Sequence, residues 1–278
     1  MLRVPGSGGL ITVLWLMLAL LPAYSSCADA QGAGTLAIRG GLLDFDLQEF
    51  DQQGDRLVHE SGPLYGIDAD VAFRSRQTEI RFGVAYYGGD VDYDGQTQTR
   101  VPINSSTREQ LVDLSLMVVY HLPSVVAPAL SLYGGPGFRY WRRDIQSAGM
   151  ASGLDESYRW WKFQAGMEMA WSQEKNRWIL DGRVIRALSP EVEINFGDRF
   201  DSADLNLGDR WGWRVGGRWI RVLSPRLEAT LDLSYQRQRL GNSNTETLKR
   251  NGAPVGSVYQ PRIEMKNLGV LIGLRRTW

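Results

Sequence analysis

Residues 65–73 decide the fold, and they read Tyr65-Gly-Ile-Asp-Ala-Asp-Val-Ala-Phe73. Every odd position is apolar or aromatic, and the even positions hold glycine, alanine and the acids Asp68 and Asp70. In a helix Asp68 would lie beside Val71 and would interrupt any apolar stripe, whereas a β-strand places the two sets on opposite faces. The stretch therefore predicts a strand with one apolar face and one ionic face.

The same alternation returns along the chain, so that ten segments qualify as strands. In segment 161–171, for example, apolar side chains occupy one face, while Lys162, Gln164 and Glu168 occupy the other. The ten predicted strands are 35–46, 65–73, 79–86, 112–120, 129–142, 161–171, 177–187, 211–219, 227–235 and 262–278.

The connections between these segments alternate in length. Short connections lie near 75–77, 122–127, 173–176 and 222–225, and long polar connections lie near 47–62, 88–108, 143–157, 188–208 and 240–260. This alternation is typical of an up-and-down antiparallel barrel with an even number of strands and with short turns at one end. We therefore predict an all-β transmembrane barrel of about ten strands, which displays long loops at its other end.

Two features favour a barrel whose apolar face meets lipid over a soluble barrel with an apolar centre. Aromatic residues such as Trp161 and Trp171 stand near both ends of the apolar faces, 8–10 residues apart, or about 27–33 Å along a strand. With tilt, this length approximates the roughly 25 Å lipid-facing band between two aromatic girdles. The opposite faces carry charges of both signs, which rarely lie in a dry soluble core. We expect these charges to fill the lumen, so that any pore would be narrow.

The composition excludes several other classes of protein. The 278 residues include 31 Lys+Arg and 31 Asp+Glu, and 43% of the chain is hydrophobic. A disordered chain would be less hydrophobic and more highly charged, and a nucleic-acid-binding protein would carry a basic excess. We therefore expect no nucleic-acid partner. The single cysteine excludes an intrachain disulfide and a multi-cysteine zinc site, and nothing else in the sequence predicts a cofactor or a metal.

The N-terminal segment predicts a secretory signal peptide over residues 1–30. Arg3 supplies its positive charge, residues 10–21 form an apolar core, and Ala28-Asp29-Ala30 is a small-residue cleavage site. The apolar run is shorter than the roughly 20 residues that a spanning helix needs. The lipoprotein alternative depends on Cys27, which lacks a leucine three residues before it. Cleavage after Ala30 leaves residues 31–278 as the barrel domain.

The C-terminus resembles the terminal strand signal of bacterial outer-membrane proteins. Leu268, Val270, Ile272 and Leu274 alternate up to the terminal Trp278, and only Arg276 departs from the pattern. This resemblance implies export through the general secretory route, recognition of the last strand by the barrel-assembly machinery, and an outer-membrane location among lipid and lipopolysaccharide. We expect the barrel to be a monomer.

Ten strands with five tall loops also resemble the omptin group of outer-membrane proteases and the ten-stranded adhesins of the same architecture. The resemblance implies a carboxylate pair and an Asp-His pair above the lumen, which together activate water. Asp90 and Asp92 match the Asp-x-Asp of the first pair. The loop at 188–208, which should supply the second pair, contains no histidine, so His59 from the first long loop is the remaining candidate base.

The candidate residues also have simpler interpretations. Asp90, Asp92 and Asp94 are compatible with a solvated turn or with a calcium site of oxygen ligands. His121, close to Ser124, reads as a hydrogen-bonded turn histidine. Because no credible base completes the site, we expect a non-enzymatic barrel with a structural or binding, adhesin-like role. An omptin-like hydrolase that uses Asp90 and Asp92 is the first alternative, and a narrow channel for small solutes is the second.

Overall fold

The structure is a computed structural model that describes residues 33–96, 101–123, 128–149 and 152–278. The predicted signal peptide over residues 1–30, with Cys27, lies outside the described residues, as does Ser124. The described residues form an all-β protein. No helix among them is both long and apolar enough to cross a bilayer.

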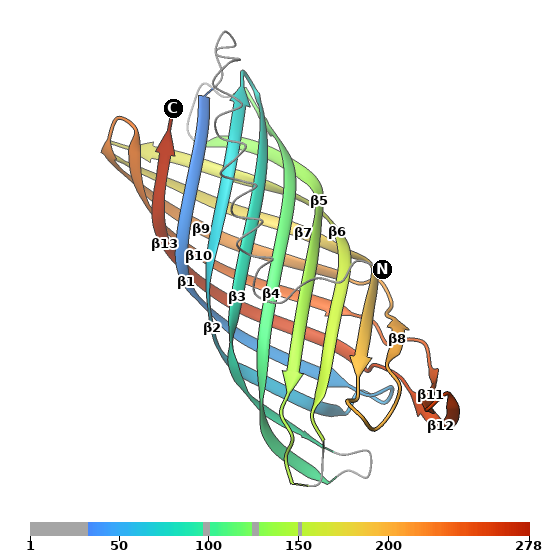
Figure 1. The fold of residues 1–278 in the computed structure, drawn as a ribbon. Coiled ribbons are helices and arrows are strands. Elements are labelled where there is room, and N and C mark those ends of the chain that lie inside the picture. Colours follow the sequence, from blue (N-terminus) through green and yellow to red (C-terminus); the bar gives the residue numbers. More distant parts are fainter. Residues whose placement is uncertain (1–32, 97–100, 124–127, 150–151) are drawn as a thin grey trace.

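Ten strands close into an antiparallel barrel, and three shorter strands extend it at one end. Around the barrel the order is β6-β5-β4-β3-β2-β1-β13-β10-β9-β7, and pairing of β6 with β7 closes the ring (Figure 1). The strands are β1 (Ala33–Phe50), β2 (Arg56–Ser75), β3 (Thr78–Gln96), β4 (Pro102–His121), β5 (Ala129–Ile145), β6 (Leu154–Gln173), β7 (Asn176–Asn195), β8 (Ala203–Asn206), β9 (Trp211–Ser224), β10 (Leu227–Leu240), β11 (Glu246–Arg250), β12 (Ala253–Val258) and β13 (Arg262–Thr277). Nine of the ten predicted segments lie within one strand of the barrel, and the tenth, 262–278, extends one residue beyond β13. The predicted fold class is therefore confirmed.

The first and last barrel strands meet at the end with the short turns, which we name the turn end. The amide of Gly34 donates to the carbonyl oxygen of Trp278 at 3.2 Å, and the amide of Trp278 donates back at 3.1 Å. The ring of Trp278 also packs edge-on against Phe73, with 6.4 Å between the ring centroids. The predicted terminal strand therefore closes the barrel on β1.

The prediction of long loops was wrong for most of their length. β3 continues to Gln96 and β4 begins at Pro102, so most of the predicted loop over 88–108 is paired strand. The segments 47–62 and 188–208 likewise consist largely of strand, and so does nearly half of 143–157. Here the barrel has left the lipid, and the outer face of its strands turns polar, which in sequence looks like a loop.

The alternation of apolar side chains changes face where this happens. On β4, Leu114, Leu116 and Val118 point outward and are exposed, but Leu111 points inward and is buried. On β6, Trp161 points outward and is exposed, whereas Trp160 and Tyr158 point inward and are fully buried. The same strand therefore presents apolar side chains to lipid at one height and to the lumen at the next.

The lipid-facing band carries aromatic side chains at both of its edges. Tyr65, Trp161 and Trp211 are all about 60% exposed and lie on its side toward the loops, while Tyr120 and Trp178 stand near the short turns. Tyrosine and tryptophan prefer such interfaces because one part of the ring system is apolar and the other can hydrogen-bond. The outward apolar face predicted from the sequence is therefore the face that the structure exposes.

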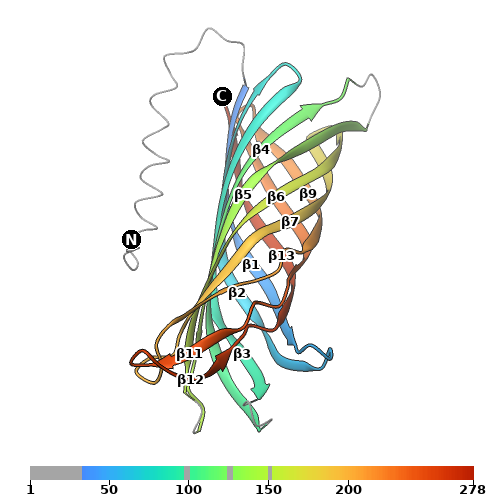
Figure 2. The same cartoon turned by 90° about the vertical axis from the view of Figure 1, so that its right-hand side faces the viewer.

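The opposite end, which we name the loop end, carries an ordered platform (Figure 2). It consists of β8, which pairs with the part of β7 nearest the loop end, and of the β11–β12 hairpin. Segment 196–201 is tied to the hairpin: the Asp201 carboxylate accepts from the amides of Asn251 and Gly252 at 3.0 and 2.8 Å, and Arg250 lies 5.0 Å over the Phe200 ring. The platform is therefore held in place by contacts between segments distant in sequence.

The change of face along each strand predicts how well the outer face of the barrel tolerates a charged side chain at different heights. Leu116→Arg places a guanidinium on the lipid-facing band of β4 and should lower the free energy of unfolding by about 2–4 kcal/mol. Ser106→Arg changes the same face of the same strand ten residues closer to the loop end, where the outer face is wet, and should leave stability within about 0.5 kcal/mol. Urea unfolding in lipid vesicles measures both. Equal losses for the two variants would contradict the assigned lipid boundary.

Candidate functional site

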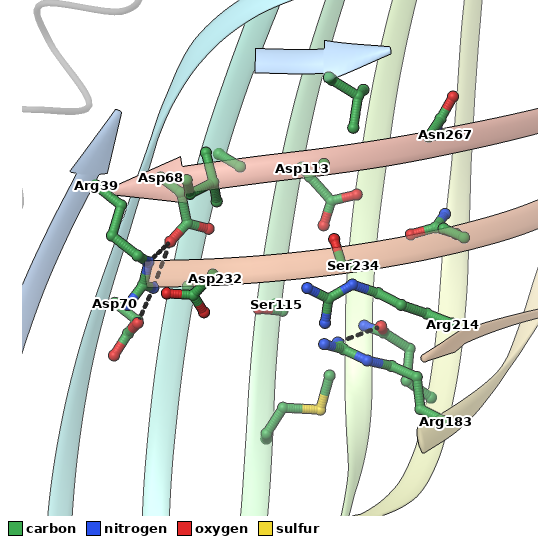
Figure 3. A pocket seen from close by; sticks show the side chains of 18 of the residues that line it. Arg39, Asp68, Asp70, Asp113, Ser115, Arg183, Arg214, Asp232, Ser234 and Asn267 are labelled. Atoms are coloured by element: carbon green, nitrogen blue, oxygen red, sulfur yellow. Dashed lines mark hydrogen bonds and ion pairs between the residues drawn. The ribbon is translucent and has the colours of Figure 1, made fainter. Parts of the chain in front are cut away.

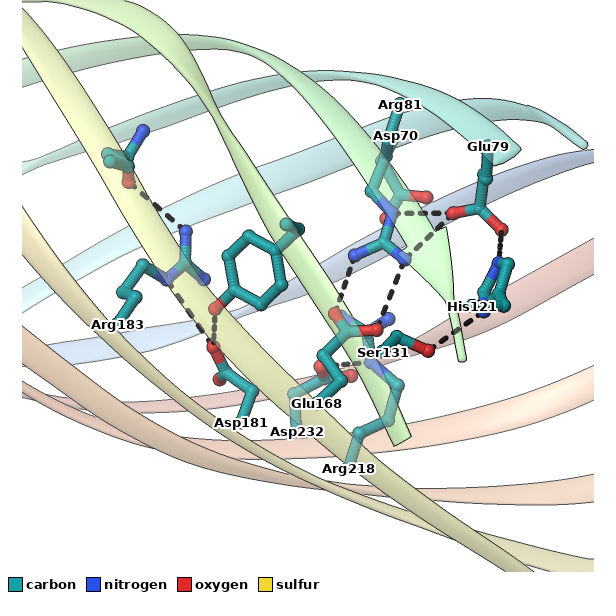
Figure 4. A network of polar contacts seen from close by, with 12 residues as sticks. Asp70, Glu79, Arg81, His121, Ser131, Glu168, Asp181, Arg183, Arg218 and Asp232 are labelled. Atoms are coloured by element: carbon teal, nitrogen blue, oxygen red, sulfur yellow. Dashed lines mark hydrogen bonds and ion pairs between the residues drawn. The ribbon is translucent and has the colours of Figure 1, made fainter. Parts of the chain in front are cut away.

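The lumen at the height of the lipid-facing band is filled by ion pairs between inward-pointing side chains. Arg81 from β3 spans the lumen to Glu168 on β6, with Nη1 and Oε1 2.8 Å apart, and also holds Glu79 on its own strand (Figure 4). Asp113 from β4 accepts from Arg139 at 2.7 Å and pairs with Lys162. These charges satisfy one another across the barrel, as the inward ionic faces predicted.

Other ionic groups complete this layer. Arg39 binds both Asp68 and Asp70, and Arg218 pairs with Asp232. Glycines on the inner wall leave room for them, because a Cβ at Gly216 would lie 2.6 Å from an oxygen of Asp181. Long ionic side chains therefore cross the lumen, and glycines on the inner wall leave the space that these side chains occupy.

An apolar layer closes the lumen nearer the loop end. Its members come from most strands of the barrel and from β8, and nearly all are less than 5% exposed. They are Phe45, Leu47, Leu64, Val91, Leu111, Trp141, Tyr158, Trp160, Ala187, Val192, Ile194, Leu205, Leu207, Leu240, Ile263 and Met265. At its centre Trp141 stacks on Tyr158, with 4.3 Å between ring centroids. This apolar seal separates the ionic lumen from the loop end.

A buried cluster of one arginine and four glutamates lies against the seal. Arg143 has no exposed surface, and its guanidinium lies 2.6 Å from Glu49, 2.9 Å from Glu60 and 2.7 Å from Glu156. Glu109 is 3.7 Å from Arg143 Nε and accepts from the Trp141 indole at 2.5 Å. The four carboxyl groups come from four different strands, so the cluster joins one side of the barrel.

This cluster lies outside the lipid-facing band. On the outer face beside it, Arg142 pairs with Asp155, and Arg108 pairs with Asp90 at 3.0 Å. These outer side chains are one-third to two-thirds exposed, and ion pairs of that kind belong in water. The apolar seal and the Arg143 cluster therefore lie in the part of the barrel that projects above the membrane.

One cation cannot neutralise four ionised carboxylates in a buried site. Burial raises the pKa of Glu49 to about 7, although the Arg143 guanidinium opposes the shift. Burial and the neighbouring Glu60 carboxyl raise the pKa of Glu109 well above its usual range. A charged group without solvent or sufficient partners takes up a proton instead. The cluster therefore holds protons at neutral pH.

The predicted catalytic residues do not assemble above the lumen. Asp90 and Asp92 share the outward face of β3, and Asp90 pairs with Arg108 rather than with another carboxyl group. His59 also points outward, and its Nε2 lies 2.9 Å from Asp46 Oδ2 on β1. Asp94, not Asp90 or Asp92, is the residue opposite His59 in the β2–β3 register. The structure therefore brings His59 and the aspartates to one patch of outer wall.

The calcium interpretation has no geometric support in the part of the chain that the structure describes. Groups of three or more His, Cys, Asp or Glu side chains with ion-binding geometry are absent among those residues. Alternating outward positions on an extended strand keep the carboxylates of Asp90, Asp92 and Asp94 in a row instead of converging on one point. This row of side chains is a solvated surface of the strand.

The structure does bring together a serine, a histidine and a carboxylate that sequence reasoning missed. His121 Nδ1 lies 2.8 Å from Ser131 Oγ, and His121 Nε2 lies 3.5 Å from Glu79 Oε2 (Figure 4). Catalysis of acyl transfer would also need donors for an oxyanion, but the amides of His121 and Leu122 already donate to the backbone carbonyls of Gln77 and Leu130. His121 and Ser131 face each other in the β4–β5 register, so the contact is a cross-strand hydrogen bond.

The Arg143 cluster was also missed, although the sequence carries its signal. Glu109 lies two residues from Leu111 on β4, and Arg143 lies two residues from Trp141 on β5, so each charge shares a face with a buried apolar residue. Continuing the period-two pattern past the lipid-facing band would have placed both charges inside the barrel. Which carboxylates meet Arg143 depends on β1, β2 and β6, and that is a property of the closed barrel.

Comparison with known proteins gives one family. A family model described as the outer membrane protein beta-barrel domain matches residues 12–182, which is more than half of the chain. No curated protein matches the chain.

Solved structures of outer-membrane proteins share the architecture. The outer membrane protease OmpT from Escherichia coli superimposes with a TM-score of 0.63 at 12% identity, over 90% of this chain and 98% of that one. OprG from Pseudomonas aeruginosa matches at 11% identity, over 88% and 96% of the two chains, with a TM-score of 0.42. The translocator domain of NalP from Neisseria meningitidis matches at 10% identity, over 94% of both chains, with a TM-score of 0.49. The likeness to OmpT is one of fold.

The protons of the Arg143 cluster predict how stability depends on pH. The folded protein keeps a proton on Glu49 between pH 4.5 and about 7, whereas the unfolded chain has lost it. The free energy of unfolding should therefore fall as the pH rises through this window, by up to about 3 kcal/mol. Urea unfolding at pH 5 and pH 8 measures the change. Glu49→Gln, which stays neutral, should remove the part of the difference that Glu49 contributes, while Glu109 keeps its own part. A wild-type protein that is more stable at pH 8 would contradict the assignment.

Proposed function

The chain belongs to the outer membrane protein β-barrel family, and from that premise we propose that it is a non-enzymatic, closed barrel that binds a partner through its loop end, as an adhesin does. The family places the chain in the bacterial outer membrane. Outer-membrane barrels keep their short turns in the periplasm and their longer connections outside. The platform of β8, β11 and β12 therefore faces the cell exterior.

The apolar seal is the observation that carries this proposal. A channel needs a continuous wet path, but Trp141, Tyr158 and Trp160 fill the lumen with fully buried rings above the ionic layer. Interiors packed in this way hold few voids larger than a water molecule. The closed lumen supports a barrel that acts at its surface and does not conduct solutes.

The loop-end platform supports a binding role. The β11–β12 hairpin exposes nearly all of its side chains, yet Asp201 and Arg250 fix its position against segment 196–201. A surface that is ordered before a partner arrives loses less conformational entropy when it binds. Exposed side chains on a fixed support are therefore suited to recognition.

A hydrolase is the second candidate, because the fold is similar to that of the protease OmpT. The omptin-like assignment would need Asp90 and Asp92 to act on water, and both point away from the lumen. Peptide cleavage by the purified barrel in the presence of lipopolysaccharide, abolished by Asp90→Asn with Asp92→Asn, would favour this candidate over the binding role.

We also infer the assembly route from the closing strand. β13 alternates apolar side chains outward up to Trp278 and pairs with β1 along its length. A terminal strand of this kind supports recognition by the barrel-assembly machinery after export through the general secretory route. The monomeric state and contact with lipopolysaccharide belong to the same proposal.

Replacing the β11–β12 hairpin tests the binding role. Exchange of residues 246–258 for a short glycine-serine turn removes the exposed hairpin of the platform, while β8 and all ten barrel strands remain. Cells that express this variant should be retained several-fold less well than wild-type cells on glass coated with serum proteins. Retention is counted under flow, after surface labelling has shown equal display. Equal retention of both strains would contradict the proposal.

Recording in planar bilayers tests the closed lumen. The purified barrel should insert without a resolvable single-channel conductance, because the apolar seal leaves no aqueous path past Trp141. Insertion is verified by heat-modifiable migration of the same preparation. Stable conductance steps from wild-type protein would favour the narrow channel instead.

A further inference from the structure

The charges of the ionic lumen balance as a whole but are shared unevenly among its ion pairs. Seven cations and seven carboxylates pair within this layer, and four of the cations, which lie on β5, β6, β7 and the start of β9, have two of the carboxylates as their ion-pair partners. The four cations are Arg139, Lys162, Arg183 and Arg214, and the two carboxylates are Asp113 and Asp181. We name this the cationic wall. The remaining carboxylates lie around Arg39, Arg81 and Arg218.

Two arginines of the cationic wall oppose each other directly. Arg183 on β7 and Arg214 on β9 are register partners, and both side chains point inward. Like charges placed opposite each other on neighbouring strands repel and destabilise the pairing. The two guanidiniums share a single carboxylate, Asp181, at 3.4 and 3.2 Å, and this carboxylate also accepts from the hydroxyl of Tyr133 at 2.6 Å.

The cationic wall also contains a buried donor without an acceptor. Gln164 on β6 is 2% exposed, and its Oε1 accepts from Arg183 Nη1 at 3.2 Å. Its Nε2 has no hydrogen-bond partner in the structure, and Arg183 Nε, 3.4 Å from Asp181 Oδ2, has an ion-pair contact without a hydrogen bond. Buried polar groups in folded proteins are nearly always hydrogen-bonded, so these donors point to a missing acceptor.

A cavity of about 190 Å3 lies against these donors (Figure 3). Its lining includes Lys162, Gln164, Arg183 and Arg214. The side chains of Arg183 and Arg214 lie next to each other and point into the same space (Figure 3). A single water needs roughly 10–15 Å3 on the same measure, so the cavity has room for a small polyatomic anion with its first waters.

We propose that the cationic wall is a binding site for a small oxyanion such as inorganic phosphate, held between the guanidiniums of Arg183 and Arg214. Guanidinium groups bind the oxygens of such anions with pairs of parallel hydrogen bonds, which a spherical ion cannot accept in the same way. The anion relieves the repulsion of the two arginines and accepts from Gln164. Because the apolar seal closes the loop end, the anion enters from the turn end.

Calorimetric titration of the detergent-folded barrel tests this site. Sodium phosphate, added at constant ionic strength set by sodium chloride, should bind saturably at one site. Arg183→Met and Arg214→Met should each weaken binding at least tenfold, while relief of the like-charge pair leaves heat-modifiable folding intact. Gln164→Leu removes only the neutral donor and should weaken binding less than either arginine variant does.

Arg275→Gln is the matched control. This arginine also points into the lumen and pairs with a carboxylate, Glu228, but it does not line the cavity. The control should bind phosphate as the wild type does. Absence of saturable binding up to tens of millimolar phosphate would overturn the proposal. Unchanged affinity in both arginine variants would do the same, and so would an equal loss in Arg275→Gln, which would indicate a diffuse field and no defined site.

Discussion

A strand that leaves lipid for water must change the face on which it carries apolar side chains. The barrel depends on this constraint at every strand. Within the bilayer the outer face meets hydrocarbon, so Leu114 and Trp161 point outward, and the lumen receives the charges. Above the bilayer the outer face meets water, so Leu111 and Trp160 point inward instead. The period of two is kept throughout, and only its polarity reverses.

The two interiors that result have different physical roles. The part of the lumen within the bilayer is ionic, and buried ion pairs contribute little net stability because desolvation offsets their attraction. Stability there comes from the closed hydrogen-bond ladder, which leaves no edge in lipid. The part of the lumen near the loop end is an apolar core of stacked rings, and burial of that apolar surface stabilises the fold through the hydrophobic effect. The Arg143 cluster lies against this core. It holds protons because the single guanidinium of Arg143 cannot neutralise all the carboxylates around it.

The candidate catalytic aspartates lie on the face of β3 that the alternation of its side chains predicts. Asp90 and Asp92 have the same parity as Ile80, Phe82 and Val84, all of which point outward on β3. Continuing that parity would have predicted that both aspartates face away from the lumen. The polarity of the segment predicts a loop, but polarity on the outer face also marks a strand that has passed into water. The same alternation of side chains along each strand correctly predicted that the charges of the ionic lumen point inward.

The sequence by itself determined the ten strands, the face of each strand that meets lipid and the charged character of the lumen. Those properties follow from side-chain order along one strand, because alternation and the length of the apolar run are local. The partners inside the barrel were decided only by the tertiary structure. Arg81 meets Glu168 from 87 residues away, and Arg143 meets Glu49 from 94 residues away. Such pairs depend on the stagger with which ten tilted strands close into a ring, and no single strand encodes that stagger.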